Sequence, residues 1–445
     1  MECDLCISCG AILTMDSQGR IYDPGYIAIK DGRIVGIGAI DSKGCCGLWE
    51  ARNTIDATGT LIMPGYVNTH THIAMSPFRG AMEDAEDRLR RFIFPLEKTV
   101  VDPQLVYDGA LFSIAEMVRS GTTCFADMYY FEEEVARAAD YSGMRAIVGE
   151  TIVDFPAPDC DIPYGGIERA KSLSKEWRNH TRIKACIAPH APYTVDASNL
   201  RLIAHTSEAF GIPIMMHIAE MDFEYARFSQ SHGSVLRYLD ETGILSSSLI
   251  GVHMLYLDDQ DIEIAAQRKI AVAHCPGSNA KSGRPICPAW QLSKAGVAIG
   301  LGTDGPLSGN TMDMQNIVSL YPKLQKVREH KREIVSAQEA LYAATIGGAE
   351  VLGLSDQIGS IECGKCADLQ IVDLNDFNAL PVHNWYATAV YSLQAHNVRD
   401  TIVAGSFLMR QRKIMFANEE KLKENLLYHA KKSSSTIASL LEKAI

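Results

Sequence analysis

Two histidines one residue apart, His70 and His72, end the stretch PGYVNTHTH at residues 64–72. Side chains at positions i and i+2 point to the same side of a β-strand, so both imidazoles can reach one metal ion. The pair alone is a weak signal, because two histidines in one strand are equally compatible with a buried core. Other strands would have to supply the remaining ligands of a metal site.

His217 in IPIMMHIAE and Asp304 in VAIGLGTDG each end another apolar, strand-like run. With the first pair they make a set of three histidines and one aspartate. Nitrogen and carboxylate ligands with one open position suit a catalytic divalent ion, with zinc as the first choice and iron as the alternative. Such an ion would lower the pKa of bound water toward neutrality and so make hydroxide available.

Three further side chains fall beside this set. Glu220 follows His217 by three residues, and there a carboxylate can carry a proton from the metal-bound water to a ring nitrogen or a leaving group. His253 ends LIGVH, where it is expected to contact that water rather than the metal. His274 ends IAVAH, and a partly buried histidine with satisfied hydrogen bonds is an equally good interpretation of it.

The elements that must position these residues alternate between strand-like and helix-length segments. Eight strand-like runs fall at residues 61–72, 122–130, 145–150, 183–190, 212–220, 249–255, 270–279 and 297–305. Eight β/α units predict a (β/α)8 barrel, in which catalytic side chains lie at the C-terminal ends of the strands. Of the thirteen histidines, those that end these runs are His70, His72, His190, His217, His253 and His274.

The two ends of the chain do not show this alternation of strand-like and helix-length segments. Residues 1–60 form short strand-like pieces, with a hairpin turn predicted at Asp31-Gly32. Residues 356–445 return to strand-like runs and finish in a helix from about 419. We expect the two ends to build one small β-sandwich domain beside a barrel that spans residues 61–355.

The composition excludes several classes of partner. The 445 residues carry a formal net charge of −12, which disfavours binding to nucleic acid. No apolar run is long enough to cross a membrane and the N-terminus does not resemble a secretory signal, so a cytoplasmic location is expected. Two sets among the twelve cysteines, Cys3/Cys6/Cys9 and Cys363/Cys366, have spacings that can hold zinc or an iron–sulfur cluster. Small residues in strands and turns are the favoured alternative.

Several motifs together resemble the amidohydrolase superfamily. They are PGYVNTHTH, MSPFRG, GTTCFADMYY, APHAPYT, HIAE, HCPGSNAK and GTDG, in that order along the chain. The resemblance is closer to the single-metal aminohydrolase branch, which contains methylthioadenosine/S-adenosylhomocysteine deaminases, with guanine deaminases and triazine chlorohydrolases as relatives. There is no H-E-x-x-H motif, and the H-x-E with P-C-x-x-C signature of small cytidine deaminases is also missing.

The resemblance implies a role for each candidate residue. The metal ligands would be His70, His72, His217 and Asp304, with Glu220 as proton shuttle and His253 and Asp304 orienting the attacking water. Substrate contacts would come from Glu97 on ribose hydroxyls, from His190 and from Ser308. One metal is expected, because the fourth strand ends in His190 where related two-metal barrels have a carboxylated lysine. A homo-oligomer is expected by analogy only.

Two residues depart from the relatives' pattern. Arg88 stands where many of these deaminases have tryptophan, and Glu150 stands where relatives that bind the amino-acid tail of S-adenosylhomocysteine have arginine. If both residues contact the substrate, they indicate a heterocycle that is polar or carries different substituents. The alternatives are a surface charge on a helix for Arg88 and a solvated strand end for Glu150.

The sequence therefore predicts a metal-dependent deaminase. Metal hydroxide would attack a ring carbon of an aminated N-heterocycle and release ammonia, with an adenine nucleoside of the methylthioadenosine/S-adenosylhomocysteine type as the first substrate. Deamination of a purine base or pterin, or triazine-type hydrolysis, is the alternative. A non-catalytic scaffold is disfavoured, since all four metal ligands and Glu220 are present.

Overall fold

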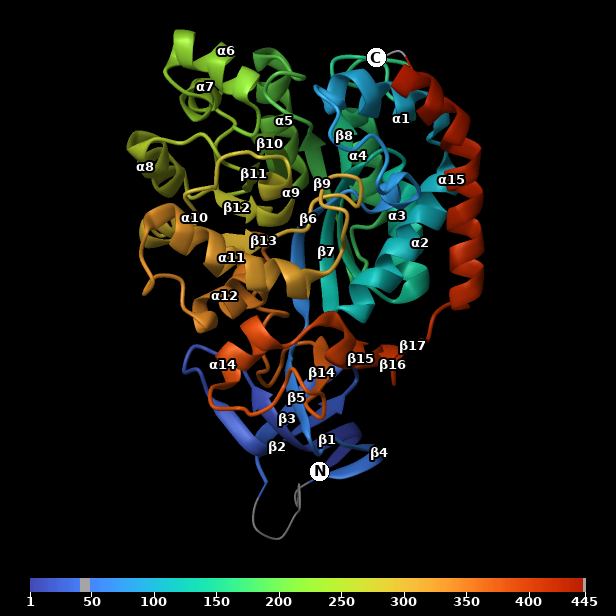
Figure 1. Cartoon of the computed structure of the whole chain (residues 1–445), viewed down its shortest axis with the longest axis vertical. Coiled ribbons are helices and arrows are strands. Elements are labelled where there is room, and N and C mark those ends of the chain that lie inside the picture. Colours follow the sequence, from blue (N-terminus) through green and yellow to red (C-terminus); the bar gives the residue numbers. More distant parts are fainter. Residues whose placement is uncertain (41–48, 443–445) are drawn as a thin grey trace.

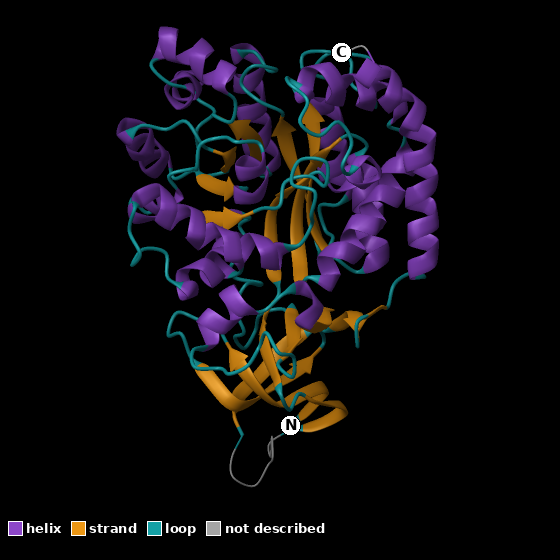
Figure 2. Cartoon of the chain, viewed as in Figure 1, coloured by secondary structure: helices purple, strands orange, loops and turns teal. Residues whose placement is uncertain are grey.

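The computed structural model describes residues 1–40 and 49–442 of the chain. Figure 1 shows a barrel surrounded by helices, with a second sheet at one end that is built from both ends of the chain. Figure 2 shows the strands of the barrel running up its middle, inside a layer of helices.

Among the described residues, eight parallel strands form the barrel in the order of the sequence. They are β6 (Tyr66–Thr71), β7 (Thr122–Tyr129), β8 (Arg145–Ile152), β9 (Ile183–Pro189), β10 (Ile214–Ile218), β11 (Leu249–His253), β12 (Ala271–His274) and β13 (Ile299–Leu301). Beyond β13, the amide of Asp304 donates to the carbonyl of His70 over 3.1 Å, which joins the last strand to the first. The predicted (β/α)8 barrel is confirmed.

Helical segments connect the strands and cover the barrel. They are η1 (Ile73–Phe78), η2 (Leu89–Ile93), α1 (Phe94–Val100), α2 (Pro103–Arg119), α3 (Glu132–Ser142), α4 (Gly166–Glu176), α5 (Ala197–Phe210), α6 (Asp222–His232), α7 (Val235–Thr242), α8 (Asp259–Arg268), α9 (Pro276–Lys281), α10 (Ala289–Lys294), α11 (Met314–Glu329), α12 (Ala337–Ala344) and α13 (Ile346–Val351). Near the C-terminus follow α14 (Trp385–Ala387), η3 (Thr388–Ser392), η4 (Ala395–Asn397) and α15 (Glu419–Glu442).

The second sheet combines strands from both ends of the chain. Its strands are β1 (Glu2–Leu13), β2 (Ile21–Lys30), β3 (Arg33–Ala39), β4 (Glu50–Asp56), β5 (Thr60–Pro64), β14 (Leu369–Asp373), β15 (Val398–Val403), β16 (Ser406–Arg410) and β17 (Lys413–Ile414). β14 pairs antiparallel with β5, which joins the C-terminal half of the sheet to the N-terminal half. The predicted hairpin at Asp31 and Gly32 is confirmed, and both turn residues have positive φ, 50° and 74°.

The run at residues 61–72, predicted as one strand, is two strands in two different sheets. β5 ends at Pro64 in the second sheet, and β6 begins at Tyr66 in the barrel. Gly65 lies between them, where a Cβ atom would come within 2.1 Å of the Thr123 side chain. The chain can therefore pass this close to β7 only with glycine at the junction.

The C-terminal helix covers the barrel rather than the second sheet. Figure 1 shows α15 running alongside α2. His429 of α15 lies 2.9 Å from the Asp108 carboxylate of α2, and Lys432 lies 2.8 Å from Asp102 at the start of α2. These contacts fix α15 against the side of the barrel.

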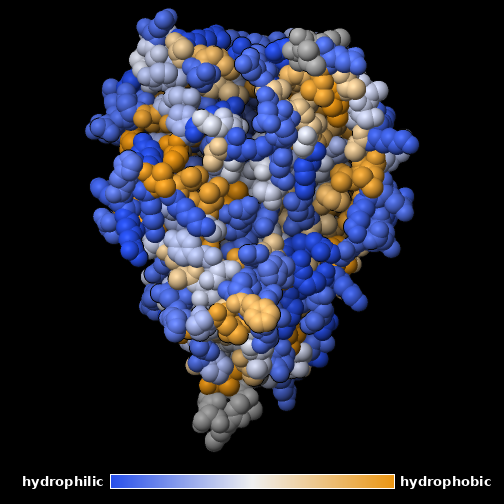
Figure 3. Space-filling model, in the orientation of Figure 1, coloured by the Kyte–Doolittle hydropathy of each residue, from blue (hydrophilic) through white to orange (hydrophobic). Residues whose placement is uncertain are grey.

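Apolar residues that alternate along the strands pack together inside the barrel. This cluster includes Val67, Ala126, Ile147, Met215 and Val252. On β6 and β10 these residues precede His70 and His217, so the polar side chains at the strand ends follow a tightly packed apolar layer. The face in Figure 3 is largely hydrophilic, with scattered hydrophobic patches. Within residues 1–40 and 49–442, no helix has the length and hydropathy needed to cross a membrane.

Candidate metal centre and substrate cavity

A cavity of about 890 Å³ opens at the C-terminal ends of the barrel strands. This size lies within the range of about 300–1,000 Å³ that is usual for small-molecule sites. Most of the residues predicted from the sequence to act on a metal, a water or a substrate line it: His72, Arg88, Glu97, His190, His217, Glu220, His253, Asp304 and Ser308. His70 lies at the same strand ends but is fully buried.

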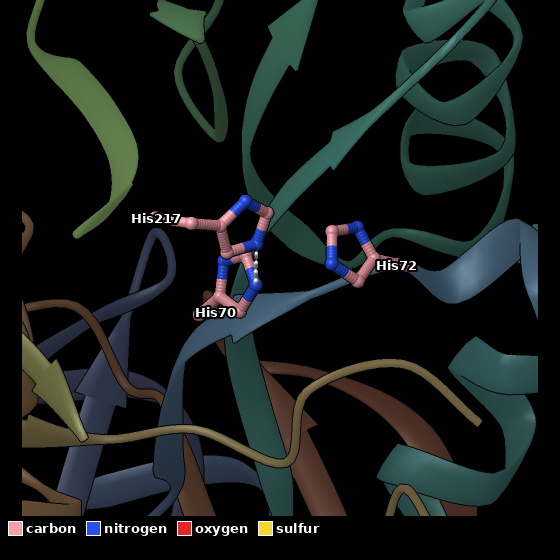
Figure 4. A group of neighbouring side chains, drawn as sticks. All are labelled: His70, His72 and His217. Carbon is pink, nitrogen blue, oxygen red and sulfur yellow. Dashed lines mark hydrogen bonds between the residues drawn. The ribbon is translucent and has the colours of Figure 1, made fainter. Parts of the chain in front are cut away.

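Three imidazoles converge on one point, as Figure 4 shows. One ring nitrogen from each of His70, His72 and His217 lies within 4.8 Å of the other two. The Nε2 atoms of His70 and His217 are only 3.1 Å apart. His70 and His72 come from the end of β6, and His217 comes from β10 on the other side of the barrel.

Hydrogen bonds at the back of two rings fix which nitrogen carries the proton. His217 Nδ1 lies 2.9 Å from the carbonyl oxygen of His190, and His72 Nδ1 lies 2.5 Å from the carbonyl oxygen of Met128. A carbonyl oxygen can only accept, so both Nδ1 atoms donate and both Nε2 atoms keep a lone pair. This arrangement is typical of histidines that bind a metal through Nε2.

Asp304 brings a carboxylate to the same point. Its Oδ1 lies 3.4 Å from His72 Nε2 and 3.9 Å from His70 Nε2. The side chain follows β13 and is 4% exposed. Burial of a carboxylate is costly without a cation or hydrogen-bond donors nearby. The four side chains therefore form a set of three nitrogens and one carboxylate that suits a divalent ion such as zinc.

Burial favours the neutral form of four histidines, His70, His190, His217 and His253. Burial first, and then repulsion from neighbouring imidazoles, holds the pKa of His70 well below its usual range. Burial likewise lowers the pKa of His217, and it lowers the pKa values of His190 and His253 strongly. Neutral imidazole is the form that binds a metal, so burial favours in His70 and His217 the form that an ion needs.

Glu220 and His253 lie together beside the metal-ligating set. His253 Nε2 is 3.6 Å from Glu220 Oε1, and His253 Nδ1 is 3.0 Å from the amide oxygen of Asn279. Asn279 was not identified from the sequence. The amide oxygen accepts from Nδ1, which leaves the lone pair of His253 on Nε2, on the side of Glu220.

Non-glycine residues at three strand ends adopt left-handed backbone conformations. They are Ala219 after β10, His253 at the end of β11 and Asp304 after β13, with φ of 51°, 71° and 60°. Such conformations cost energy for residues with a Cβ atom and gather at functional sites. Here they turn the chain where the side chains of the site leave the strands.

Arg284 is a member of the site that sequence reasoning missed. Its guanidinium Nη1 donates to Glu220 Oε1, and the residue lines the same cavity. The partners are 64 residues apart in sequence. No periodicity or motif spacing in the sequence could have connected them.

The predicted substrate contacts Glu97, His190 and Ser308 all line the cavity. Glu97 lies on α1 and is 4% exposed, and burial raises the pKa of its carboxyl to about 8. It is therefore largely protonated near pH 7 and able to donate a hydrogen bond. His190 Nδ1 lies 3.0 Å from the Thr194 hydroxyl, which fixes the ring at the cavity wall.

Arg88 and Glu150, the two residues that depart from the relatives' pattern, lie in different places. Arg88 lines the cavity and donates to the carbonyl of Leu307 over 2.7 Å, so it is not a surface charge. Glu150 is 1% exposed, and its Oε1 lies 3.2 Å from Arg169 Nε. It does not line the cavity. Its neighbour Thr151 does, because successive side chains of a strand point to opposite faces.

His274 also lies outside the cavity. Its ring packs against Tyr321 of α11, with centroids 5.7 Å apart, and neither ring nitrogen has a hydrogen-bond partner among the described residues. Burial lowers its pKa to about 3. His274 is thus a buried histidine outside the cavity, but within the described part of the chain its ring nitrogens lack the hydrogen bonds that this interpretation expects.

In the part of the chain that the structure describes, neither cysteine set belongs to a group of candidate metal ligands. Cys3 and Cys6 are buried in β1, whereas Cys9 and Cys363 are exposed. In the described ranges, the group of three or more candidate ligands that could hold an ion is His70, His72 and His217, and no cysteine joins it. The alternative interpretation, small residues in strands and turns, fits these positions.

Comparisons with known proteins agree on one family for this chain. The model of the amidohydrolase family matches residues 61–408. A 5-methylthioadenosine/S-adenosylhomocysteine deaminase of Syntrophobacter fumaroxidans is 35% identical over 431 residues, covering 96% of this chain and 98% of the relative. A protein of the same name from Aquifex aeolicus is 34% identical over 417 residues, covering 93% and 95%.

Solved structures show the same architecture. An adenosine deaminase from Xanthomonas campestris with bound zinc superposes with a TM-score of 0.94 at 33% identity, covering 98% of this chain and 99% of that one. Guanine deaminase of E. coli superposes with a TM-score of 0.76 at 22% identity, covering 91% and 99%. The second likeness shows the fold alone.

Proposed function

The chain belongs to the amidohydrolase family, and we propose that it hydrolyses the amino group of an adenine nucleoside of the methylthioadenosine/S-adenosylhomocysteine type. The observation that carries this proposal is the convergence of His70, His72, His217 and Asp304 beside Glu220 in one cavity. Relatives that match almost the whole chain carry the name of this activity.

One divalent ion, zinc in the first place, would be held by His70, His72, His217 and Asp304. The short approach of two imidazole Nε2 atoms, 3.1 Å apart, supports this assignment. Without an ion, one of these atoms must carry a proton to avoid lone-pair repulsion, and that proton is lost when an ion binds. When bound, the ion lowers the pKa of a water molecule toward neutrality, which is the chemistry that hydrolysis needs.

The protein's own side chains then handle orientation and protons. Asp304 and His253 accept hydrogen bonds from the attacking water and aim it at the ring carbon that carries the amino group. Glu220 takes a proton from the water and passes it to the adjacent ring nitrogen, which makes the carbon electrophilic. A C–O bond forms, the C–N bond breaks, and ammonia leaves with a proton returned through Asp304 or His253.

The outer part of the cavity would bind the sugar. Glu97 is buried and largely protonated near pH 7, so its carboxyl can both donate to and accept from ribose hydroxyls. His190 and Ser308 would contact the base, since both line the same cavity. Arg88 would close the cavity from the segment that precedes α1, where the Leu307 and Ala81 carbonyls anchor its guanidinium.

Glu150 no longer argues against an amino-acid tail on the substrate. Its carboxylate faces Arg169 and Asp159 instead of the cavity, and burial raises its pKa well above the usual range. It cannot repel a substrate carboxylate from this position. S-adenosylhomocysteine therefore stays within the proposed substrate type.

The test is steady-state ammonia release by zinc-loaded protein with a panel of substrates. The panel contains methylthioadenosine, S-adenosylhomocysteine, adenosine, guanine, pterin and an aminotriazine. We expect kcat/KM for an adenine nucleoside to exceed that for every other compound by at least about tenfold, a difference of roughly 1.4 kcal/mol. A preference for guanine, pterin or the triazine would contradict the proposed substrate and leave the hydrolase chemistry standing.

A further inference from the structure

Arg284 reaches into the cavity from the segment that follows α9. The turn after α9 closes through Gly283, with φ of 65°, and the Arg284 amide donates to the Asn279 carbonyl over 3.0 Å. From there the side chain extends to Glu220. One guanidinium nitrogen donates to Glu220 Oε1, and the other lies 3.0 Å from the sulfur of Met221.

The two carboxylate oxygens of Glu220 have different surroundings. Oε1 lies between the Arg284 guanidinium and His253 Nε2, which is 3.6 Å away. Oε2 accepts no hydrogen bond from any residue in the described part of the chain. One oxygen is thus anchored by the protein, and the other is available to a substrate.

The backbone that carries Glu220 is already fixed by another residue. The buried carboxylate of Glu224 accepts hydrogen bonds from the amides of Ala219, Glu220 and Met221, at 2.9, 2.9 and 3.2 Å. The remaining freedom of Glu220 lies in its side-chain torsions. Among the described residues, Arg284 makes the one hydrogen bond to this carboxylate.

We propose that Arg284 is a positioning residue that anchors Glu220 through Oε1 and so presents Oε2 to the ring nitrogen of the substrate. This inference rests on the proposed function, in which Glu220 transfers the proton. Arginine stays protonated in proteins, so Arg284 cannot itself exchange the proton and must act through Glu220.

The segment that carries Arg284 positions the second proton-handling group as well. Asn279 on α9 accepts from His253 Nδ1 over 3.0 Å, and its backbone carbonyl accepts from the Arg284 amide. The segment Pro276–Arg284 therefore holds His253 with one side chain and Glu220 with another. The segment thus helps to set their relative placement, 3.6 Å between His253 Nε2 and Glu220 Oε1.

The first test compares Arg284→Met and Arg284→Lys with the wild type, all loaded with zinc. We expect Arg284→Met to lower kcat for methylthioadenosine by about 10- to 100-fold, because a misplaced proton-transfer group loses most of its effect. KM should change by less than about threefold. Arg284→Lys should recover part of the loss, since lysine keeps the charge but not the planar fork.

Arg268→Met is the matched control. It removes a guanidinium–carboxylate pair of the same kind, with Asp240, on the outer surface of the barrel. Its kcat should equal that of the wild type. An unchanged kcat in Arg284→Met would overturn the proposal, and so would a rise in KM alone, which would make Arg284 a substrate contact instead.

The second test does not depend on activity. In a crystal structure of zinc-loaded Arg284→Met, or of Arg284→Lys if the first variant does not fold, the Glu220 side chain should leave its wild-type rotamer or spread over several. One rotamer, ordered as in the wild type, would overturn the proposal. A displaced Glu220 in a protein whose wild type deaminates no nucleoside would support the positioning role and contradict only the proposed function.

Discussion

Glu220→Gln is the substitution that isolates proton transfer from metal binding. Glutamine keeps the size of the side chain, and its amide oxygen can still accept from Arg284, but an amide does not carry a proton at neutral pH. General acid–base catalysis contributes typically about 10²- to 10⁴-fold, so kcat should fall by that factor, or roughly 3–5 kcal/mol in the barrier. Glu220 is not among the three nitrogen ligands, so zinc should remain bound.

Three measurements separate these effects. Ammonia release gives kcat, elemental analysis gives zinc per chain, and calorimetry gives the affinity for methylthioadenosine. We expect full zinc content, nearly unchanged affinity and the large loss in kcat. A variant with full zinc and a kcat within about threefold of the wild type would refute the role of Glu220. Loss of zinc from the variant would instead make Glu220 a ligand.

Three other changes test other parts of the site. His217→Ala removes one of the three converging imidazoles, so zinc content and ammonia release should both be lost; stoichiometric zinc by elemental analysis would show that His217 is not a ligand. Glu97→Leu removes the group that would donate to and accept from the ribose hydroxyls, so it should raise KM for methylthioadenosine about 10-fold and leave deamination of free adenine unaffected, whereas equal effects on both compounds would contradict a contact with ribose. His274→Leu tests pH dependence. Burial lowers the pKa of His274 from 6.5 to about 3, so the unfolded state binds more protons between these values, and the wild type loses stability as the pH falls through this window. Between pH 7.5 and pH 5, the free energy of unfolding measured with urea should fall by about 2 kcal/mol more in the wild type than in the variant. Parallel pH profiles of the two proteins would contradict this.

The barrel could be predicted from the sequence because buried parallel strands appear there as short runs of apolar residues. The strands β7 and β9 to β13 lie within the predicted runs, β8 extends two residues beyond its run, and β6 forms the second half of the first. What could not be seen was the division of that first run at Gly65. The division depends on how closely the chain approaches Thr123, and such an approach leaves no local pattern.

The position of a residue at a strand end was a good but incomplete guide to the site. It placed His217 and Asp304 correctly beside His70 and His72. It failed for His274, which lies at the end of β12 but packs outward against α11. Strand alternation separates these cases: Ala273 belongs to the cluster inside the barrel, so its neighbour His274 points to the helices.

The same alternation explains Glu150, whose neighbour Thr151 reaches the cavity. Arg284 and Asn279 could not be predicted, because their partners, 64 and 26 residues away in sequence, come close only in the folded barrel. The cytoplasmic location, the homo-oligomer and the domain limits at residues 60 and 355 stay predictions.

The most direct test of the central claim is ammonia release from methylthioadenosine by one preparation in three states: as purified, after removal of metal with a chelator, and after addition of one equivalent of zinc. We expect the rate to disappear with the metal and to return at one zinc per chain, because three imidazoles and Asp304 form one ligand set. An unchanged rate in the metal-free protein would contradict a catalytic metal at this site. A zinc-loaded protein that releases no ammonia from any adenine nucleoside would contradict the proposed reaction.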